Sequence, residues 1–442
     1  MMSNMPLVSL TTLLCNLITL RFAPTDAAST LPPADDDELG RAAAIFSGPV
    51  EIVADGSQHD FHWLESPVWS ESGQYLLFSD VKWTRPDDGL VCGMIWKYDQ
   101  ATNNVTKFLE CSGLAAPPDK DAVDGLPADI ADRAEGGSNG LALLEDGTLL
   151  VNQHAWKRII SLNIDDIDAD SASVDPALVA VLVDTYKGAP LNSPNDMVVV
   201  SADDGGKVLY FTDPPFGLQY KEVNDPFGYS FELMTQDAPA VYKYTLHSDK
   251  QKDSDGHIAR LLQFEVNEDW SKRSGPNGIA FNKETGSLAV VITDWNDPRT
   301  EIYAQNTDDG SYNPKPKMIL KHEYRIDGNP TALADGATYD SNLGVLIVSG
   351  PGGIYMYEHV ADDNYETLGF LRIDDLCSNN VIGGGYLWLT CNQRLLRVPL
   401  NASRSGPSNP NETSPATKFR THVGLWLSIV FCFAVVSAIS LF

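Results

Sequence analysis

Five polar residues in this sequence could together bind a metal ion. Each stands directly before, or at the start of, an apolar segment, and they recur along the chain as Glu65, Asn139, Asn195, Asn277 and Asp335. Carboxylate and carboxamide oxygens are hard ligands that suit Ca²⁺ and, less exclusively, Mg²⁺ or Mn²⁺, with Zn²⁺ as a further candidate. A single Asn-Asp pair before a strand is usually turn chemistry. If these residues only form turns, we expect them at scattered places in the chain. A metal site instead requires them at equivalent places in successive repeats.

The elements that would position these residues repeat six times. Each unit has a polar residue, an apolar strand, a turn with Gly or Asp and a second apolar strand, and the units begin at Leu64, Ser138, Pro194, Pro276, Ala334 and Ser378. Repeats of about 40 to 50 residues built from hairpins are typical of a β-propeller, whose blades stack around an axis because they cannot bury their faces alone. The sequence therefore predicts an all-β, six-bladed β-propeller with a central divalent-metal site, where the polar residues converge.

The two ends of the chain have the composition of targeting segments. Residues 1–28 contain the apolar stretch "PLVSLTTLLCNLITL", as a signal peptide does. The propeller is expected over residues 42–400, followed by a Ser-, Pro- and Asn-rich stalk over residues 401–422 and an uncharged tail over residues 423–442. A polar spacer before such a tail is the pattern of a GPI anchor, here with Asn411 as the expected anchor position, and a retained transmembrane span is the alternative.

The charge of the chain limits its partners. There are 31 Lys and Arg against 60 Asp and Glu, a formal net charge of −29. Such a charge repels nucleic acid and anionic membrane surfaces at long range, and it favours cations. We expect no nucleic-acid partner, membrane attachment only through the tail or a lipid anchor, and a monomer.

Cysteines and glycosylation sequons indicate the secretory pathway. Two of the six cysteines fall in the terminal segments, and the even number that is left suits disulfides. Of the three possible connectivities we favour Cys92 with Cys111 and Cys377 with Cys391, because each pair falls within one unit. Sequons compatible with glycosylation begin at Asn104, Asn401 and Asn411. We expect the mature protein to be secreted or held on the extracellular face of the plasma membrane.

Six motifs in order give the chain a family resemblance. "ESPVW", "SNGLAL", "LNSPNDMVV", "LYFTDPPFG", "PNGIAF" and "ADGATYD" resemble those of the senescence-marker-protein and gluconolactonase family of six-bladed propellers, from about Val50 to about Pro399. The resemblance implies a catalytic divalent metal and hydrolysis of a small lactone or ester. It implies that the metal is held by Glu65, Asn195, Asn277 and Asp335. The family usually has Glu-Gly-Pro in the first motif, and Ser66 replaces that Gly here, which we expect to narrow the mouth beside the metal.

The remaining candidate residues would act around the metal. The resemblance makes Asp335 the residue that transfers the proton, while Asn139 would contact substrate on the channel. Asp196 is a weaker candidate, since strand alternation turns it away from Asn195. His154 could assist as a base, although a single His near a strand end is more often structural.

Two other function classes stay open. One is a surface-anchored binding or adhesion propeller with a structural Ca²⁺ and no turnover. The other is a propeller enzyme similar to strictosidine synthase, which has the same architecture but lacks the set of four metal ligands. Metal analysis and a panel of lactones distinguish these classes from a lactonase.

Overall fold

The computed structural model describes residues 36–115, 133–202, 205–219, 233–246, 257–265, 274–294, 297–322 and 333–401. The predicted signal peptide, the stalk beyond residue 401, the sequon at Asn411 and the hydrophobic tail lie outside these residues. Most of the long segments between Cys111 and Gly137 and between Phe216 and residue 269 also lie outside them.

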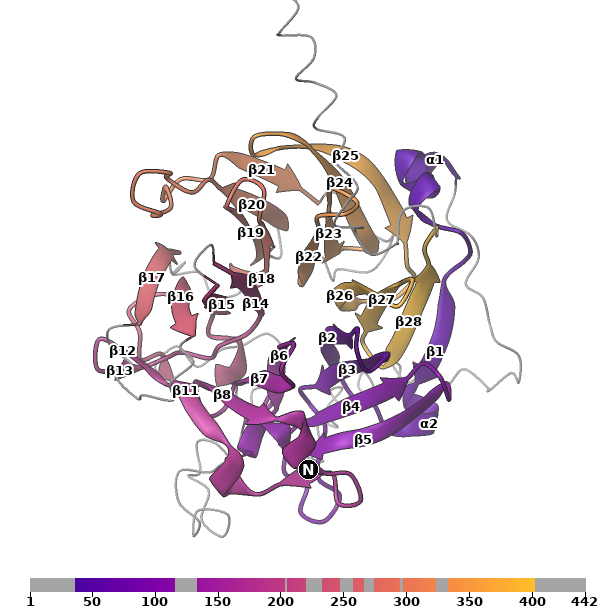
Figure 1. The fold of residues 1–442 in the computed structure, drawn as a ribbon, viewed down its shortest axis with the longest axis vertical. Coiled ribbons are helices and arrows are strands. Elements are labelled where there is room, and N and C mark those ends of the chain that lie inside the picture. Colours follow the sequence, from indigo (N-terminus) through magenta and orange to yellow (C-terminus); the bar gives the residue numbers. More distant parts are fainter. Residues whose placement is uncertain are drawn as a thin grey trace, which may run out of the picture.

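Six antiparallel sheets of four strands surround a central axis, which confirms the predicted six-bladed propeller (Figure 1). Blade 1 contains β2 (Leu64–Ser70), β3 (Tyr75–Asp80), β4 (Met94–Asp99) and β5 (Asn104–Glu110). Blade 2 contains β6 (Ser138–Leu143), β7 (Thr148–Gln153), β8 (Arg158–Asn163) and β11 (Ala180–Val183). Blade 3 contains β14 (Met197–Ser201), β15 (Lys207–Asp213), β16 (Ala240–Leu246) and β17 (Ile258–Gln263).

The other three blades have the same plan. Blade 4 contains β18 (Ser274–Asn282), β19 (Ser287–Asp294), β20 (Arg299–Tyr303) and β21 (Met318–Lys321). Blade 5 contains β22 (Ala337–Asp340), β23 (Val345–Gly350), β24 (Gly353–Ala361) and β25 (Asn364–Arg372). Blade 6 contains β26 (Cys377–Gly383), β27 (Tyr386–Cys391), β28 (Arg394–Pro399) and, from the other end of the chain, β1 (Glu51–Asp55).

Short elements connect the blades or extend them. The helices are α1 (Asp36–Leu39), η2 (Gly40–Ile45), α2 (Gly56–His59), η3 (Ser112–Leu114), η4 (Ile164–Asp166), η5 (Pro176–Leu178) and η6 (Phe216–Leu218). Two small hairpins pair β9 (Ile167–Asp168) with β10 (Ser173–Val174) and β12 (Thr185–Tyr186) with β13 (Ala189–Pro190). Within the ranges described above, no helix is both long and apolar enough to cross a membrane.

The ring closes where β1 pairs with β28, because a strand from the start of the chain completes the last blade. The helical segment before it, Asp36–Ile45, packs on β25 of blade 5. Its side chains Ala42 and Ile45 are buried in the core between blades 5 and 6. The packed body thus begins before residue 42.

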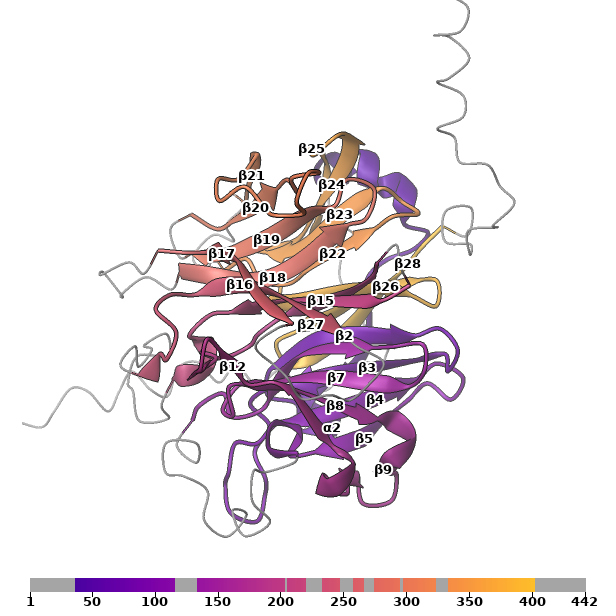
Figure 2. The ribbon, with the colours of Figure 1, turned by 60° about the vertical axis from the view of Figure 1, so that its left-hand side comes forward.

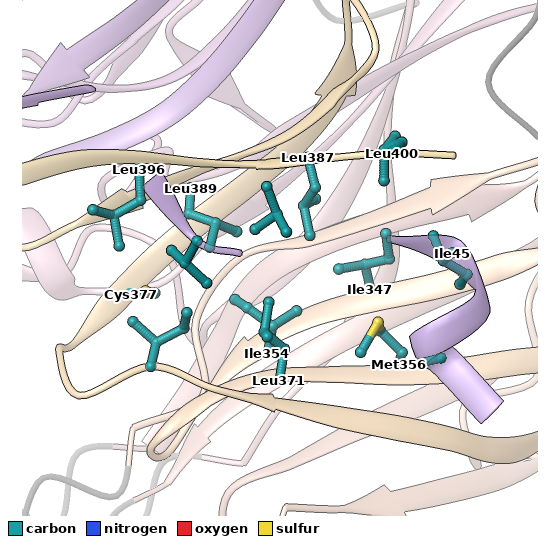
Figure 3. Packing of buried hydrophobic residues seen from close by; sticks show 14 of the residues in the cluster. Ile45, Ile347, Ile354, Met356, Leu371, Cys377, Leu387, Leu389, Leu396 and Leu400 are labelled. Carbon is teal, nitrogen blue, oxygen red and sulfur yellow. The ribbon is translucent and has the colours of Figure 1, made fainter. Parts of the chain in front are cut away.

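The strand sequences follow from the stacking of the blades. Six buried hydrophobic clusters lie one between each pair of neighbouring blades. A central strand such as β23 is buried at every position because it has a blade on each side, whereas an outer strand such as β5 alternates between buried and exposed positions. Figure 2 shows the sheets stacked face to face, and Figure 3 shows one cluster, with Ile347 and Met356 of blade 5 facing Leu387 and Leu389 of blade 6.

Both predicted disulfides are confirmed. Cys92 pairs with Cys111, which connects the loop before β4 to the end of β5. Cys377 pairs with Cys391, its register partner on the neighbouring strand of blade 6. Each disulfide therefore cross-links two segments of the same blade.

The two described sequon asparagines differ in their surroundings. Asn104 is exposed at the first position of β5. The Nδ2 of Asn401, the atom that a glycan would modify, donates hydrogen bonds to the backbone oxygens of Ala44 and Phe46, at 2.8 Å and 3.1 Å. Asn104 is consequently the more accessible of the two predicted glycosylation positions.

Candidate active site

A pocket at the start of the innermost strands contains all five residues of the recurrent polar set. It holds about 310 Å³ of empty space, part of it open to solvent. Its lining residues are Trp63, Glu65, Glu135, Asn139, Asn195, Phe216, Asn277, Thr293, Leu333 and Asp335. Residues separated by up to 272 positions in sequence are thus brought to one place by the propeller.

Five blades each supply one member of the set, from the innermost strand or from the residues just before it. Glu65 and Asn139 are the second residues of β2 and β6, and Asn277 lies within β18. Asn195 and Asp335 come shortly before β14 and β22. These strands surround the centre of the ring in Figure 1. The equivalent place in blade 6 is occupied by Ser378, whose backbone oxygen accepts from the N–H of Gly336 at 2.6 Å.

Hydrogen bonds between neighbouring blades fix the backbone of this set. In three blades a polar residue of the second strand donates to the backbone oxygen of the next blade's pocket residue. The pairs are Ser79 to Asn139 at 2.8 Å, Asn152 to Asn195 at 2.7 Å and Thr212 to Asn277 at 2.6 Å. Two further bonds, from Thr293 to Ala334 and from Ser378 to Leu64, both at 2.5 Å, act next to Asp335 and Glu65. The positions of the five side chains are therefore coupled around the ring.

The glycines in the "NG" motifs allow these blades to approach closely. A Cβ atom on Gly140 would lie 2.4 Å from the backbone oxygen of Asn195, and one on Gly278 would lie 2.3 Å from that of Asp335. Such contacts are sterically forbidden, so any side chain there would push the blades apart. The Asn-Gly pairs thus mark contacts between blades and not hairpin turns.

Asp196 takes the place that glycine has in those blades, and it does not line the pocket. Its carboxylate accepts from the backbone N–H groups of Met197, at 2.9 Å, and Ile279, at 3.3 Å. Burial raises the pKa of Asp196 to about 7, although these two hydrogen bonds oppose the shift. This residue connects blade 3 to blade 4 beneath the pocket.

Carboxylates dominate the electrostatics of the pocket. Glu65 is 4% exposed and accepts a hydrogen bond from the indole Nε1 of Trp63 at 3.0 Å. Burial, and then the charge of Asp335, raise the pKa of Glu65 well above its usual value, and the Trp63 bond opposes this. A carboxylate in such a place is costly to ionise unless a positive charge is near.

Glu135 adds a third carboxylate to the pocket. It is 5% exposed, and its Oε1 lies 3.2 Å from the Nζ of Lys82. Its Oε2 lies 3.8 Å from the Nδ1 of His154. His154 is fully buried and is not among the residues that line the pocket.

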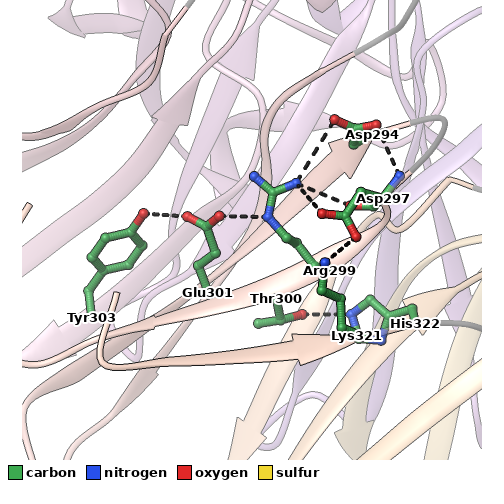
Figure 4. Close-up of polar contacts among 8 residues, drawn as sticks. All are labelled: Asp294, Asp297, Arg299, Thr300, Glu301, Tyr303, Lys321 and His322. Atoms are coloured by element: carbon green, nitrogen blue, oxygen red, sulfur yellow. Dashed lines mark hydrogen bonds and ion pairs between the residues drawn. The ribbon is translucent and has the colours of Figure 1, made fainter. Parts of the chain in front are cut away.

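A partly buried ion-pair network lies next to Thr293 of the pocket lining. Thr293 is followed by Asp294, the last residue of β19, whose Oδ2 lies 3.9 Å from the Nη1 of Arg299. The Nε of Arg299 lies 2.7 Å from the Oε1 of Glu301 (Figure 4). This network joins β19 to β20 directly beside the pocket.

The donor set fits a hard divalent cation. Glu65, Asn195, Asn277 and Asp335 present only oxygen acceptors and carboxamides to one small pocket, which suits Ca²⁺ better than a thiolate- or imidazole-binding metal. Lys82 offsets one of the three carboxylates, and a divalent cation would offset the other two. Over the part of the chain that the structure describes, no group of three or more His, Cys, Asp or Glu could hold a metal by itself.

Sequence reasoning missed five of the lining residues. Trp63 and Leu333 stand two positions before Glu65 and Asp335, and in an extended chain such positions share a face. That spacing could have identified both. Thr293 is the next-to-last residue of its second strand, where Ser79 and Thr212 also stand, so that recurrence could have identified it. Glu135 and Phe216 lie outside the recurrent strands, so the repeat carried no signal for them.

Comparison with known proteins gives one curated relative and many solved structures. No family model matches the chain. A gluconolactonase from Zymomonas mobilis is 30% identical over 322 residues, which cover 70% of each protein. The solved structure of a gluconolactonase from Xanthomonas campestris superposes with a TM-score of 0.56 at 22% identity, and the match covers 86% of this chain and 99% of that one. At this level of identity the structural match establishes the fold alone.

Proposed function

Because the chain belongs to the gluconolactonase family, we propose that it hydrolyses lactones in the central pocket with the help of a divalent cation, Ca²⁺ in the first instance. The observation that carries this proposal is the convergence of Glu65, Asn195, Asn277 and Asp335 on one pocket from four different blades. These four residues would hold the cation. When bound, it would act as a Lewis acid on the lactone carbonyl and stabilise the negative charge that develops there.

The chain's own residues then supply the proton transfers. Water adds to the carbonyl carbon, the ring C–O bond breaks, and the product is a hydroxy acid. Asp335 would accept the proton of the attacking water on a carboxylate oxygen and return it to the ring oxygen as that oxygen leaves. Asp335 suits this role because it lines the pocket, where its charge is close enough to Glu65 to raise the pKa of that carboxyl.

The rest of the lining would bind the substrate. Asn139 can donate to a hydroxyl or carbonyl oxygen, and Glu135, which pairs with Lys82, can accept from a hydroxyl group. Trp63, Phe216 and Leu333 give the pocket an apolar wall. A small ring that carries both hydroxyl groups and apolar C–H faces fits such a lining, which favours a sugar lactone over a long-chain fatty ester.

A substrate panel with metal control tests this proposal. The purified protein is assayed for its metal content and then for hydrolysis of sugar, aromatic and fatty lactones before and after chelation. The proposal predicts turnover of a sugar lactone that chelation abolishes and Ca²⁺ restores. Bound Ca²⁺ without any turnover would support a binding propeller, and turnover of another kind without bound metal would support an enzyme of the strictosidine-synthase type.

A further inference from the structure

Ser66 has a backbone conformation that side chains disfavour. It follows Glu65 in β2 with φ of 38°, in the left-handed region where glycine is preferred, and the pairing of β2 with β3 is irregular between Glu65 and Val68. Ser66 is 4% exposed. A buried non-glycine residue in this conformation calls for a compensating role of its side chain.

The hydroxyl of Ser66 is part of a chain of hydrogen bonds that runs from Asn379 to Asn139. The backbone N–H of Asn380 donates to the Oδ1 of Asn379 at 2.8 Å. A backbone N–H can only donate, so that atom of Asn379 must be the oxygen, and the Nδ2 must be the atom 3.4 Å from the Oγ of Ser66. Ser66 therefore accepts there, and its own proton is available to the Oδ1 of Asn139 at 3.3 Å.

Close packing keeps this chain in place. A Cβ atom on Gly336 would lie 2.1 Å from the Cγ of Asn379, so the carboxamide of Asn379 occupies the space that glycine leaves open. Asn379 is 5% exposed and Asn139 is 4% exposed. The amide of Asn379 therefore has no room to reorganise freely.

The hydrogen bond from Ser66 limits which atoms of the Asn139 carboxamide are available to the pocket. Its Oδ1 accepts from Ser66, which leaves the two N–H donors of its Nδ2 for a group bound in the pocket. An amide nitrogen donates and cannot coordinate a cation, which separates Asn139 from the oxygen donors Asn195 and Asn277.

We propose that Ser66 is a positioning residue whose hydroxyl orients Asn139 so that its Nδ2 donates a hydrogen bond to an oxygen of the substrate. This inference rests on the proposed function, since it assigns one substrate contact within the same pocket. The substrate class it selects is a lactone with a hydroxyl or carbonyl acceptor at that position.

Two substitutions separate the hydroxyl of Ser66 from its backbone strain. Ser66→Ala removes the hydroxyl and keeps the strained Cβ, whereas Ser66→Gly removes both. With D-glucono-1,5-lactone as the probe and acid release as the signal, both variants should show KM raised roughly tenfold, the size of one lost hydrogen bond to substrate, with kcat changed by less than about threefold. Ser66→Gly should have a higher Tm than Ser66→Ala, because glycine relieves the strain.

A double substitution provides the decisive control. Asn139→Ala should raise KM by itself, and adding Ser66→Ala in that background should raise it no further, since Ser66 acts only through Asn139. Unchanged KM in both single variants, or effects of Ser66 and Asn139 that multiply, would overturn the inference. A wild-type protein with no activity on any lactone would overturn the proposed function and this inference with it, and that outcome is recognised before any variant is made.

Discussion

The Nδ2 of Asn277 lies 2.9 Å from the hydroxyl oxygen of Thr293, and that hydroxyl lies 2.5 Å from the backbone oxygen of Ala334. A backbone oxygen can only accept, so the single proton of Thr293 is used there and Thr293 must accept from Asn277. The Oδ1 of Asn277 is therefore the atom available to a cation. One hydroxyl both orients a proposed ligand and joins blade 4 to blade 5.

We expect Thr293→Val to weaken Ca²⁺ binding by roughly 10- to 100-fold, since the carboxamide of Asn277 loses the group that orients it. The affinity is measured by titration calorimetry on chelator-treated protein. Thr338→Val is the matched control: Thr338 also donates across blades, to the backbone oxygen of Asn380 at 2.7 Å, but it is not next to a proposed ligand. Equal affinities in the two variants would contradict the orienting role.

The two pocket carboxylates should differ in what they do for turnover. Glu65→Gln and Asp335→Asn each keep an oxygen and remove one negative charge, so both should weaken Ca²⁺ binding. At saturating Ca²⁺, Asp335→Asn should lower kcat by about 10²- to 10⁴-fold because the proton acceptor is gone, and Glu65→Gln by much less. If the two variants lose kcat equally, the assignment of the proton transfer to Asp335 is wrong.

His322 should make stability fall as the pH is lowered. It lies in the core with its Nε2 2.9 Å from the Oγ1 of Thr300 (Figure 4) and its Nδ1 3.0 Å from the hydroxyl of Tyr357. Burial lowers the pKa of His322 from 6.5 to about 3. Between these values the unfolded chain binds a proton that the folded protein does not, so the contribution of His322 to stability is present above pH 6.5 and is lost towards pH 3.

The His322 effect can be isolated by comparison. Urea unfolding at several pH values should show the wild type losing about 1.4 kcal/mol per pH unit between pH 6 and pH 4 relative to His322→Gln, which cannot gain this proton. Both proteins have the same carboxylates, so the contribution of these groups to the pH dependence of stability cancels in the comparison. Parallel pH profiles would mean that His322 titrates in the folded state.

The propeller was predictable because its signal is repeated. Each blade needs a central strand that is mostly apolar, and in blades 2 and 4 the pocket residue needs a glycine beside it where the next blade approaches, at Gly140 and Gly278. Both features recur along the chain, so the sequence shows them as a pattern. The pairing of Cys377 with Cys391 was predictable for a related reason, since both fall in one hairpin.

Other parts of the site have no periodic cause in the sequence. Glu135 enters the pocket from a connection and not from an innermost strand, and its contacts with Lys82 and His154 depend on how blades 1 and 2 meet. The direction of the hydrogen bond between Ser66 and Asn139 depends on Asn379, more than 300 residues away from Ser66 in sequence. Such relationships become visible only when the ring is closed.

The hydrophobic tail gives a prediction about location. Residues 423–442 carry no charge and follow a polar segment, and we propose that they are exchanged for a GPI anchor. Treatment of intact cells with a phosphatidylinositol-specific phospholipase should then release the protein into the medium. Protein that stays on the cells, with the tail detected by mass spectrometry, would indicate a transmembrane span.

The most direct test of the central claim is the rate of sugar-lactone hydrolysis as Ca²⁺ is returned to chelator-treated protein. For the wild type we predict no activity above background without metal and full recovery with Ca²⁺. For Asn195→Ala, which removes one proposed ligand and leaves the apolar strands of blade 3 intact, we predict that recovery needs far more Ca²⁺ or does not occur, while the protein stays folded. Full activity without metal, or an Asn195→Ala protein that recovers like the wild type, would contradict the account.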